Sequence, residues 1–247
     1  MLPSVLWFDS VDSTQRVAIE CVLQNDRRHT LICARHQTAG RGRKGAEWYD
    51  EPDTSLLVSL ILWEVPIPDP VGLLGMVGAM AVAELIDTFL QEVACPSVPL
   101  ALKYPNDVLL AHRKVAGVLV EVVQAVPIVG IGLNVAQAQF PQGLRAKATS
   151  IRQVVGMPTP EQFLRERARW VNWLYTAFHH WQQQAHTAPA RFHQQWCARD
   201  SSAGRFYRVL DTGEIGTAVS VEPDFRLRLR LPNGREVATY YVESTEL

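Results

Sequence analysis

The sequence predicts an α+β protein, in which a large part of mixed strands and helices is followed by a small all-β unit. Three observations predict this class. Short apolar runs with branched residues alternate with helical patterns over the first 135 residues. A long amphipathic pattern then covers residues 160–184. From residue 205 onward, apolar and polar residues alternate between turn signals. The length of 247 residues suits one large domain plus a small one.

The first part can be assigned element by element. Asp12, Ser13 and Thr14 offer side-chain oxygens that can cap a helix, which follows at helical spacing. The polar residues 37–53, rich in Gly and Arg, predict a long loop. The polar residues 111–114 predict a four-residue hairpin turn. The expected elements are strands at 5–8, 30–34, 55–63, 100–103, 107–110, 115–123 and 128–135, and a long helix at 72–93.

That long helix is expected to be buried. Its longest uninterrupted apolar run, residues 71–83, has 13 residues, whereas about 20 are needed to span a bilayer. A second long helix is expected at 160–184 and a short one at 189–199, after a break at Pro189. The alternating segment behind them predicts a domain boundary near residue 200.

Composition excludes several classes of protein. A net charge of −1 argues against a protein that coats nucleic acid through bulk positive charge. The four cysteines, Cys21, Cys33, Cys95 and Cys197, are far apart and form no CxxC pair. A disulfide framework or a metal knuckle is therefore a poor interpretation, and a reducing cytoplasm is the expected location.

Residues 40–45, Gly-Arg-Gly-Arg-Lys-Gly, have the spacing of a dinucleotide-binding fingerprint. The context rejects that reading, because the fingerprint must open a helix and here a strand follows. What remains is a glycine-rich loop with three cations, which suits a phosphate or carboxylate ligand. The alternative is a basic loop that is merely solvated.

Three further segments carry candidate chemistry. Asp107, after Pro105 and Asn106, offers a carboxylate that could hold Mg²⁺ or orient a lysine, although Asn and Asp also simply favour turns. Lys114 precedes a strand, where a lysine is usually just exposed. The segment 130–135 places two glycines inside a strand, which indicates close approach of another group or else a bulge.

Together these segments resemble one family, the biotin protein ligases, also called biotin–[acetyl-CoA-carboxylase] ligases. The resemblance covers residues 5–136 closely and the C-terminal unit loosely, and it depends on the order and approximate spacing of the whole set. The set is Ser13-Thr14, Gln37, Gly40-Arg41-Gly42-Arg43-Lys44-Gly45 with Trp48, Lys103-x-Pro105-Asn106-Asp107, Lys114-x-Ala116-Gly117-x-Leu119-x-Glu121 and Gly130-x-Gly132-x-Asn134. The sequence departs from the family at Ala46, usually a basic residue, and at Tyr104, usually Trp.

The resemblance implies a mixed sheet backed by helices, with a catalytic biotin- and ATP-binding domain over 1–200 and an SH3-like β-barrel over 201–247. The family's roles imply biotin contacts from Ser13, Thr14, Gln15, Gln37, Gly40, Arg41, Gly42, Arg43, Lys114 and Gly117. They imply nucleotide contacts from Arg41, Arg43, Lys44, Trp48, Lys103, Asn106 and Asn134. Arg43, Lys114 and Asp107 are the expected catalytic residues, with Asp107 also the candidate Mg²⁺ ligand.

The implied reaction has two halves: biotin and ATP give biotinyl-5′-AMP, and the biotinyl group then passes to a lysine of a biotin carboxyl carrier protein. The biotin carboxylate is ionised at pH 7, so its attack on phosphorus needs cations rather than a base. No nucleic-acid or membrane partner is expected, and a homodimer through an apolar sheet edge is kept as an option.

Three alternatives remain to be weighed. A lipoate–protein ligase shares the fold and reaction type but would need a longer apolar pocket and lacks the basic glycine loop. A non-catalytic regulator of the ligase type would carry a DNA-binding domain before the catalytic part, and the chain is expected to be the non-regulatory type without it. A degenerate biotin-binding module would not be expected to retain Arg43, Asp107 and Lys114.

Overall fold

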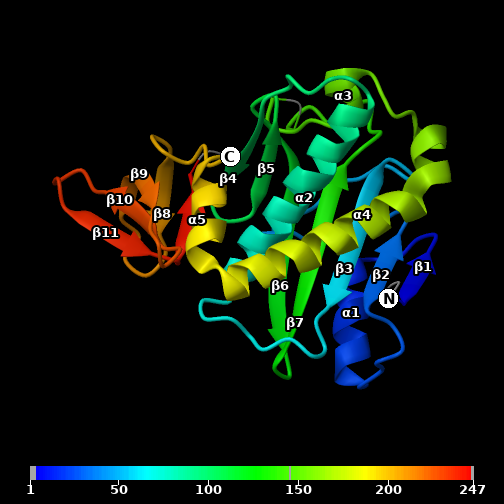
Figure 1. Ribbon diagram of the computed structural model, residues 1–247, viewed down its shortest axis with the longest axis horizontal. Helices are drawn as coiled ribbons and strands as arrows, with labels where there is room; N and C mark the ends of the chain where they lie inside the picture. The colour runs from blue at the N-terminus through cyan, green and yellow to red at the C-terminus, as the bar shows by residue number, and fades with distance from the viewer. Residues whose placement is uncertain (1–3, 145, 246–247) are drawn as a thin grey trace.

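The computed structural model describes residues 4–144 and 146–245, which form a large sheet and a smaller one (Figure 1). The strands of the large sheet are β1 (Val5–Phe8), β2 (Leu31–Ala34), β3 (Ser55–Ile61), β4 (Leu100–Lys103), β5 (Asp107–Leu110), β6 (Arg113–Val123) and β7 (Val126–Asn134). Their order is β1-β2-β3-β7-β6-β5-β4. The sheet is mixed, because β1 runs parallel to β2 and every other neighbouring pair is antiparallel.

Two long helices, α2 (Leu73–Glu92) and α4 (Pro160–Thr187), cross the face of the sheet that is nearer the viewer in Figure 1. The side chains that alternate toward them along β3, Leu56, Val58 and Leu60, are almost fully buried in the main core. By length and composition α2 could cross a membrane, but 78% of its apolar window is buried inside the protein. It therefore forms the centre of the core, as the sequence predicts.

The opposite face of the sheet carries α1 (Thr14–Leu23), which packs its apolar side on a second, smaller core. Ala18 and Val22 of the helix meet Ile32, Ile61 and Ile128 of three neighbouring strands. The first turn of α1 reaches beyond this core, over glycine-containing stretches of the sheet. This face holds the candidate site.

The C-terminal unit is an antiparallel sheet of five strands, β8 (Phe206–Val209), β9 (Ile215–Val221), β10 (Leu227–Arg230), β11 (Glu236–Thr239) and β12 (Val242–Ser244). Their order is β11-β10-β9-β8-β12, and the unit stands at one end of the large sheet in Figure 1. The Tyr104 hydroxyl donates to the Phe225 carbonyl at 3.0 Å, and the Tyr207 hydroxyl donates to the Tyr104 carbonyl at 3.2 Å. These buried contacts fix the unit to the turn that follows β4. Among the described residues, two short helices, α3 (Ile151–Val155) and α5 (Pro189–Cys197), and a 3-10 turn, η1 (Arg43–Gly45), complete the fold.

The α+β class is confirmed, with a helix-backed mixed sheet and a small C-terminal β unit. One local prediction is wrong. The hairpin turn has two residues, not four: Ala111 and His112 have φ of 47° and 65°, and Lys114 already belongs to β6. Two positive φ values give the turn the twist that a tight hairpin needs. Such turns are usually indicated by an Asn-Gly pair, which this sequence does not have at residues 111–112. Helix α3 was not predicted.

Candidate active site

A cavity of about 490 Å³ lies on the α1 side of the large sheet. Its walls come from the first turn of α1, the loop 41–48, the strands β3, β4, β5, β6 and β7, residues 144 and 146–148, and the C-terminal unit. All of the predicted site residues line it except Gly40 and Asn134. Segments far apart in the sequence therefore meet at one place, as the motif set predicts.

One end of the cavity is a buried network of hydrogen bonds. The Thr14 backbone N–H donates to Gln37 Oε1 at 2.8 Å. Thr14 Oγ1 lies 2.9 Å from Ser59 Oγ, and Ser59 Oγ donates to Gln15 Oε1 at 3.0 Å. Ser13 caps α1, because its Oγ accepts from the Gln15 N–H at 3.2 Å. Ser13 therefore caps α1 and also lines the cavity. We call this set, Ser13, Thr14, Gln15, Gln37 and Ser59, the enclosed end.

Glycines of β6 and β7 form the floor of the cavity, and the Trp48 indole lies on it. A Cβ added at Gly132 would come within 2.5 Å of Trp48 Cε2, and one at Gly117 within 3.4 Å of Trp48 Cζ3. A Cβ at Gly130 would come within 2.6 Å of Gln15 Oε1. The register of β7 with β6 is unbroken here, so close approach and not a bulge explains these glycines.

The glycine-rich loop forms a narrow hairpin above this floor. The Gly42 N–H donates to the Ala46 carbonyl at 2.6 Å, and the Trp48 N–H donates to the Gly40 carbonyl at 2.9 Å. Gly40 lies behind the cavity, where a Cβ would meet Trp48 O at 2.5 Å. Its predicted biotin contact therefore stays a prediction, while its structural role is to let the two arms of the loop close up.

The tip of the loop rests on two other parts of the chain. Arg43 Nη1 donates to Asn106 Oδ1 at 3.2 Å, and Arg43 Nη2 donates to the Val242 carbonyl of β12 at 3.4 Å. Lys44 Nζ lies 2.9 Å from Glu243 Oε2. The C-terminal unit thus contacts the loop directly.

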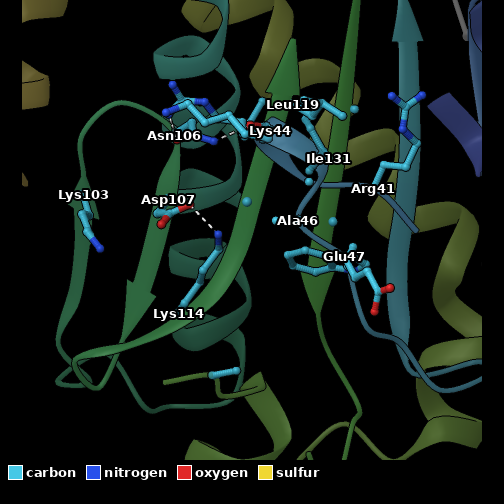
Figure 2. A pocket seen from close by; sticks show the side chains of 18 of the residues that line it. Arg41, Lys44, Ala46, Glu47, Lys103, Asn106, Asp107, Lys114, Leu119 and Ile131 are labelled. Carbon is cyan, nitrogen blue, oxygen red and sulfur yellow. Dashed lines mark hydrogen bonds and ion pairs between the residues drawn. The ribbon is translucent and has the colours of Figure 1, made fainter. Parts of the chain in front are cut away.

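The other end of the cavity gathers cations, and we call it the cationic end. Lys114 on β6 points toward Asp107 on the neighbouring strand β5 (Figure 2), and Nζ lies 2.6 Å from Asp107 Oδ1. Lys103, on β4, is about nine-tenths buried and also lines the cavity. The cationic side chains in the wall outnumber the carboxylates Glu47, Asp107 and Glu243. The cationic ones are Arg41, Arg43, Lys44, Lys103, Lys114, Lys147 and Arg205. This wall is suited to an anion with several charges.

Asn134 is buried behind the cavity wall rather than in it. Its Nδ2 donates to the Thr149 carbonyl at 3.0 Å. The same segment hydrogen-bonds the backbone of Lys114 on both sides: the Lys114 N–H donates to the Lys147 carbonyl and the Thr149 N–H donates to the Lys114 carbonyl, each at 2.8 Å. Asn134 therefore supports a lining segment, and its nucleotide contact stays a prediction.

Asp50 holds the base of the glycine-rich loop. Its buried carboxylate accepts from His36 Nδ1 at 2.9 Å and from the Gln37 N–H at 3.3 Å. Burial raises the pKa of Asp50 above its ordinary value, and the hydrogen bond from His36 opposes that change. The hydrogen bond between Gln37 and Asp50 joins the two ends of the loop 37–53. Since Gln37 belongs to the enclosed end, Asp50 also helps to fix that end of the cavity.

Asp107 is the predicted carboxylate ligand for magnesium, and it lines the cavity beside Lys114. In residues 4–144 and 146–245, no three His, Cys, Asp or Glu side chains gather closely enough to hold a metal by themselves. Mg²⁺ commonly takes only one or two carboxylates and completes its shell with phosphates and water. Asp107 can serve in that way, so the Mg²⁺ assignment stays a prediction.

Several residues that line the cavity were not predicted from the sequence. Ser59 interrupts an apolar strand, and a polar residue on the face of a buried strand is a signal that could have found it. Lys147, Arg205 and Glu243 gave no local signal, because they reach the cavity only through the fold.

The profile of the biotin/lipoate A/B protein ligase family matches residues 7–137. A biotin–[acetyl-CoA-carboxylase] ligase of Paracoccus denitrificans is 35% identical over 222 residues, which cover 83% of this chain and 86% of that protein. The enzyme of that name from Mycobacterium tuberculosis is 36% identical over 151 residues, covering 58% of this chain and about half, 54%, of the relative.

Solved structures agree on the fold. The biotin protein ligase from Aquifex aeolicus, in complex with biotin and ATP, superposes with a TM-score of 0.75 at 24% identity, over 98% of both chains. The biotin protein ligase from Leishmania major, in complex with biotinyl-5-AMP, gives a TM-score of 0.65 at 21% identity. The architecture of the large sheet and the C-terminal unit is therefore shared with these proteins.

Proposed function

We propose that this chain, which belongs to the biotin/lipoate A/B protein ligase family, is an ATP-dependent biotin protein ligase. It would activate biotin as biotinyl-5′-AMP and transfer the biotinyl group to a lysine of the biotin carboxyl carrier protein of acetyl-CoA carboxylase. The names of its relatives support the activity and the class of acceptor. The domain division near residue 200 and the cytoplasmic location are part of the same proposal.

The observation that carries the proposal is that one cavity has two chemically different ends. The enclosed end offers paired, fixed polar groups, which suit a neutral ring with both donors and an acceptor, such as the ureido ring of biotin. The cationic end offers Lys114, Arg43 and their neighbours, which suit a carboxylate and a triphosphate. A molecule bound between them would present its carboxylate to the nucleotide.

In the first half-reaction a biotin carboxylate oxygen attacks the α-phosphorus of ATP. A new oxygen–phosphorus bond forms, the bond between the α-phosphorus and the bridging oxygen breaks, and pyrophosphate leaves with its electron pair. Two anions must meet, so the barrier is chiefly electrostatic. Lys114 and Arg43 lower it by offsetting negative charge. Bound Mg²⁺, with Asp107 as a ligand, would supply further positive charge to the phosphates.

In the second half-reaction the acceptor lysine attacks the carbonyl carbon of the mixed anhydride, and AMP leaves. A lysine amine has a reference pKa of about 10.4, so it must lose a proton before it attacks. Asp107, whose carboxylate lies beside Lys114 in the cavity wall, can orient this amine or accept the proton. Its present partner, the Lys114 ammonium, keeps the carboxylate directed into the cavity.

The glycine-rich loop has a purpose in this scheme, because a mixed anhydride hydrolyses when water reaches it. Its tip already contacts Asn106 and β12, and Trp48 closes it over the floor. We propose that residues 40–48 are the lid that retains the adenylate.

The nearest rival is a lipoate–protein ligase. A dithiolane ring has no N–H donor and no carbonyl, so it would leave the buried polar groups of the enclosed end without partners. A non-catalytic biotin-binding regulator is the second rival, and it would bind biotin without consuming ATP.

Incubation with ATP, magnesium, a purified carrier domain and either radiolabelled biotin or radiolabelled lipoate tests all three. The proposal expects label on the carrier lysine, and biotin-dependent exchange of pyrophosphate into ATP when the carrier is omitted. A lipoate ligase would instead label the carrier from lipoate, and a regulator would bind biotin without exchange. Either of these outcomes would overturn the proposal.

A further inference from the structure

Ser59 is a buried polar residue in the middle of β3, whose remaining residues are mostly Leu, Val and Ile. It has no exposed surface, faces the α1 side of the sheet, and stands opposite Gly130 of β7. It lines the cavity, where its hydroxyl contacts the side chains of Thr14 and Gln15. A hydroxyl buried in this way must be hydrogen-bonded, and the direction of its bonds is fixed by its neighbours.

A hydroxyl has a single proton to donate, so the direction of this chain of bonds can be derived. The Gln15 carboxamide is oriented by its Nε2, which donates to the Ile128 carbonyl at 3.5 Å. Its Oε1 therefore faces Ser59 and takes the Ser59 proton at 3.0 Å. Toward Thr14 the Ser59 oxygen is left with lone pairs, and the Thr14 proton is drawn to it across 2.9 Å.

Gln37 is oriented from the other side. Its Oε1 accepts the Thr14 backbone N–H at 2.8 Å, so its Nε2 is the atom left to donate to a ligand. Thr14 Oγ1 also lies 3.1 Å from that Oε1, but its one proton can serve only one of the two oxygens. Gln37 Oε1 already has a donor, whereas Ser59 Oγ has no other donor among the hydrogen bonds it makes.

We propose that Ser59 is a positioning residue that sets the polarity of the enclosed end, and thereby makes it specific for a cyclic urea. With its proton committed to Ser59, Thr14 Oγ1 meets the ligand as an acceptor, and Gln37 Nε2 meets it as a donor. A urea places an N–H directly beside a carbonyl, which matches this pair. The inference rests on the proposed function, because it deepens the recognition of biotin.

The test compares biotin with its two cyclic carbamate analogues, in which a ring oxygen replaces one or the other ureido N–H. The shape is nearly unchanged, but a donor becomes an acceptor. In the wild-type protein, the carbamate whose oxygen faces Thr14 is expected to bind about tenfold more weakly, the scale of one hydrogen bond. In Ser59→Ala the Thr14 hydroxyl can turn and donate to that ring oxygen, so the preference for biotin is expected to fall to about twofold.

Ser55→Ala is the matched control. Ser55 lies on the same strand and the same face, is equally buried, and is not part of the cavity wall. It should keep the wild-type preference between the ligands. Affinity is measured by calorimetry, and KM and kcat by biotin-dependent pyrophosphate exchange. The change in Ser59→Ala should fall on KM for biotin, because Ser59 acts on ligand orientation and touches no reacting atom.

The outcomes separate the two claims. If the wild-type protein does not bind biotin, the proposed function fails. If it binds biotin but Ser59→Ala keeps the wild-type preference over both carbamates, the inference fails alone. Ser59→Cys is the second variant, in case Ser59→Ala does not fold. Its thiol is a weak donor and acceptor, so the preference should again fall, and an unchanged preference would overturn the inference.

Discussion

The two ends of the cavity are built in opposite ways. At the enclosed end, Thr14, Gln15 and Ser59 are at most 4% exposed and hold one another across α1 and β3. At the cationic end, the side chains of Lys114 and Lys44 are 40% and 38% exposed, and each is paired with a carboxylate that a ligand could replace. One end is assembled before any ligand arrives, and the other can exchange partners.

This difference follows from what each end must handle. A neutral polar ring is bound at a gain only if every buried donor and acceptor finds a partner, so the protein groups must be fixed in advance. Anionic groups that form and leave during a reaction need cations that can move with the charge. For that reason Thr14, Gln15 and Ser59 lie on α1 and β3, whereas Arg43 and Lys44 lie on a loop that rests on β12.

The largest effect is expected at Lys114. If this lysine were only a solvated charge at a strand start, Lys114→Ala would change stability and activity by little, within about 0.5 kcal/mol. If it stabilises the transition state, adenylation should slow by roughly 10²-fold or more with near-normal stability, the scale of one lost transition-state donor. Biotin-dependent pyrophosphate exchange measures this step alone.

Lys114→Arg provides the control for charge. A planar guanidinium does not replace a compact ammonium 2.6 Å from Asp107, so this variant should also be impaired. Wild-type exchange by a folded Lys114→Ala variant would remove the residue from the active site and leave the cationic end without a role in catalysis.

Arg43 should give the next largest effect. Its contacts in the structure, Asn106 Oδ1 and the Val242 carbonyl, are long and replaceable by an anionic oxygen. Loss of a charge-assisted contact costs about 1.5–3 kcal/mol, so Arg43→Ala should make or retain adenylate roughly 10- to 100-fold less well. Biotin binding should survive, because the enclosed end is intact. Adenylate release is followed by filter binding, and wild-type formation and retention would refute the role of the lid.

The sequence predicted most of the elements well, because apolar periodicity is a local signal. The predicted site residues line one cavity, except for Gly40 and Asn134, and their individual roles stay predictions. Apolar periodicity indicated α2 and β3. The ordered set of motifs predicted that Thr14, Lys114 and Gly132 belong to one site, and all three line the same cavity. The sequence did not predict the two-residue turn at Ala111 and His112, whose sequence lacks the usual turn residues. The contributions of Arg205 and Glu243 depend on the packing of the C-terminal unit.

That packing also bears on the predicted boundary near residue 200. Most of the buried apolar side chains of the C-terminal unit belong to the same continuous cluster as those of the large sheet. Phe192 of α5 lies with its ring centroid 5.8 Å from that of Phe225. A change in composition along the sequence predicts separate domains. It cannot predict a shared core, because that core forms between segments that are far apart in the sequence. The boundary therefore stays a prediction.

Gly132→Ala tests the floor that joins the two ends. The new Cβ would lie 2.5 Å from the Trp48 ring, so the indole must shift and the lid with it. Overpacking of this kind costs typically 1–3 kcal/mol, and we expect biotin to bind about tenfold more weakly. Gly143→Ala is the control, because a Cβ there meets no atom within 4 Å. Equal affinity in both variants would mean that Trp48 does not define the floor.

Two aspartates that follow the lid in the sequence, Asp50 and Asp53, should have pKa values shifted in opposite directions from the ordinary value. Burial raises the pKa of Asp50, so the native state binds its proton more tightly and stability from this group is lost as pH rises from 3.8 through the native pKa. The Arg35 guanidinium lowers the pKa of Asp53, whose stabilisation is present above 3.8 and is lost as pH falls through the lower native value.

Carboxyl carbon chemical shifts, followed by NMR against pH, measure both native values directly. Asp50 is expected to titrate above 3.8 and Asp53 below it. If Asp50 titrates at or below 3.8, water reaches its carboxylate at the base of the glycine-rich loop more freely than the structure indicates.

The smallest effect is expected at Glu243, and its smallness is informative. The ion pair of Lys44 with Glu243 spans 2.9 Å, but the side chains are 38% and 46% exposed, and such pairs contribute about 0.2–1 kcal/mol. If the pair only helps the lid rest on β12, Glu243→Gln should speed adenylate loss by no more than about fivefold at low salt. The difference should shrink as salt rises, because exposed charges are screened.

Glu214→Gln, which breaks the exposed pair with Arg235 elsewhere on the C-terminal unit, should leave retention unchanged. A loss in Glu243→Gln as large as that in Arg43→Ala, and insensitive to salt, would mean that the carboxylate acts on the ligand itself. The cationic end would then be as firmly assembled as the enclosed one, and the contrast between them would fail.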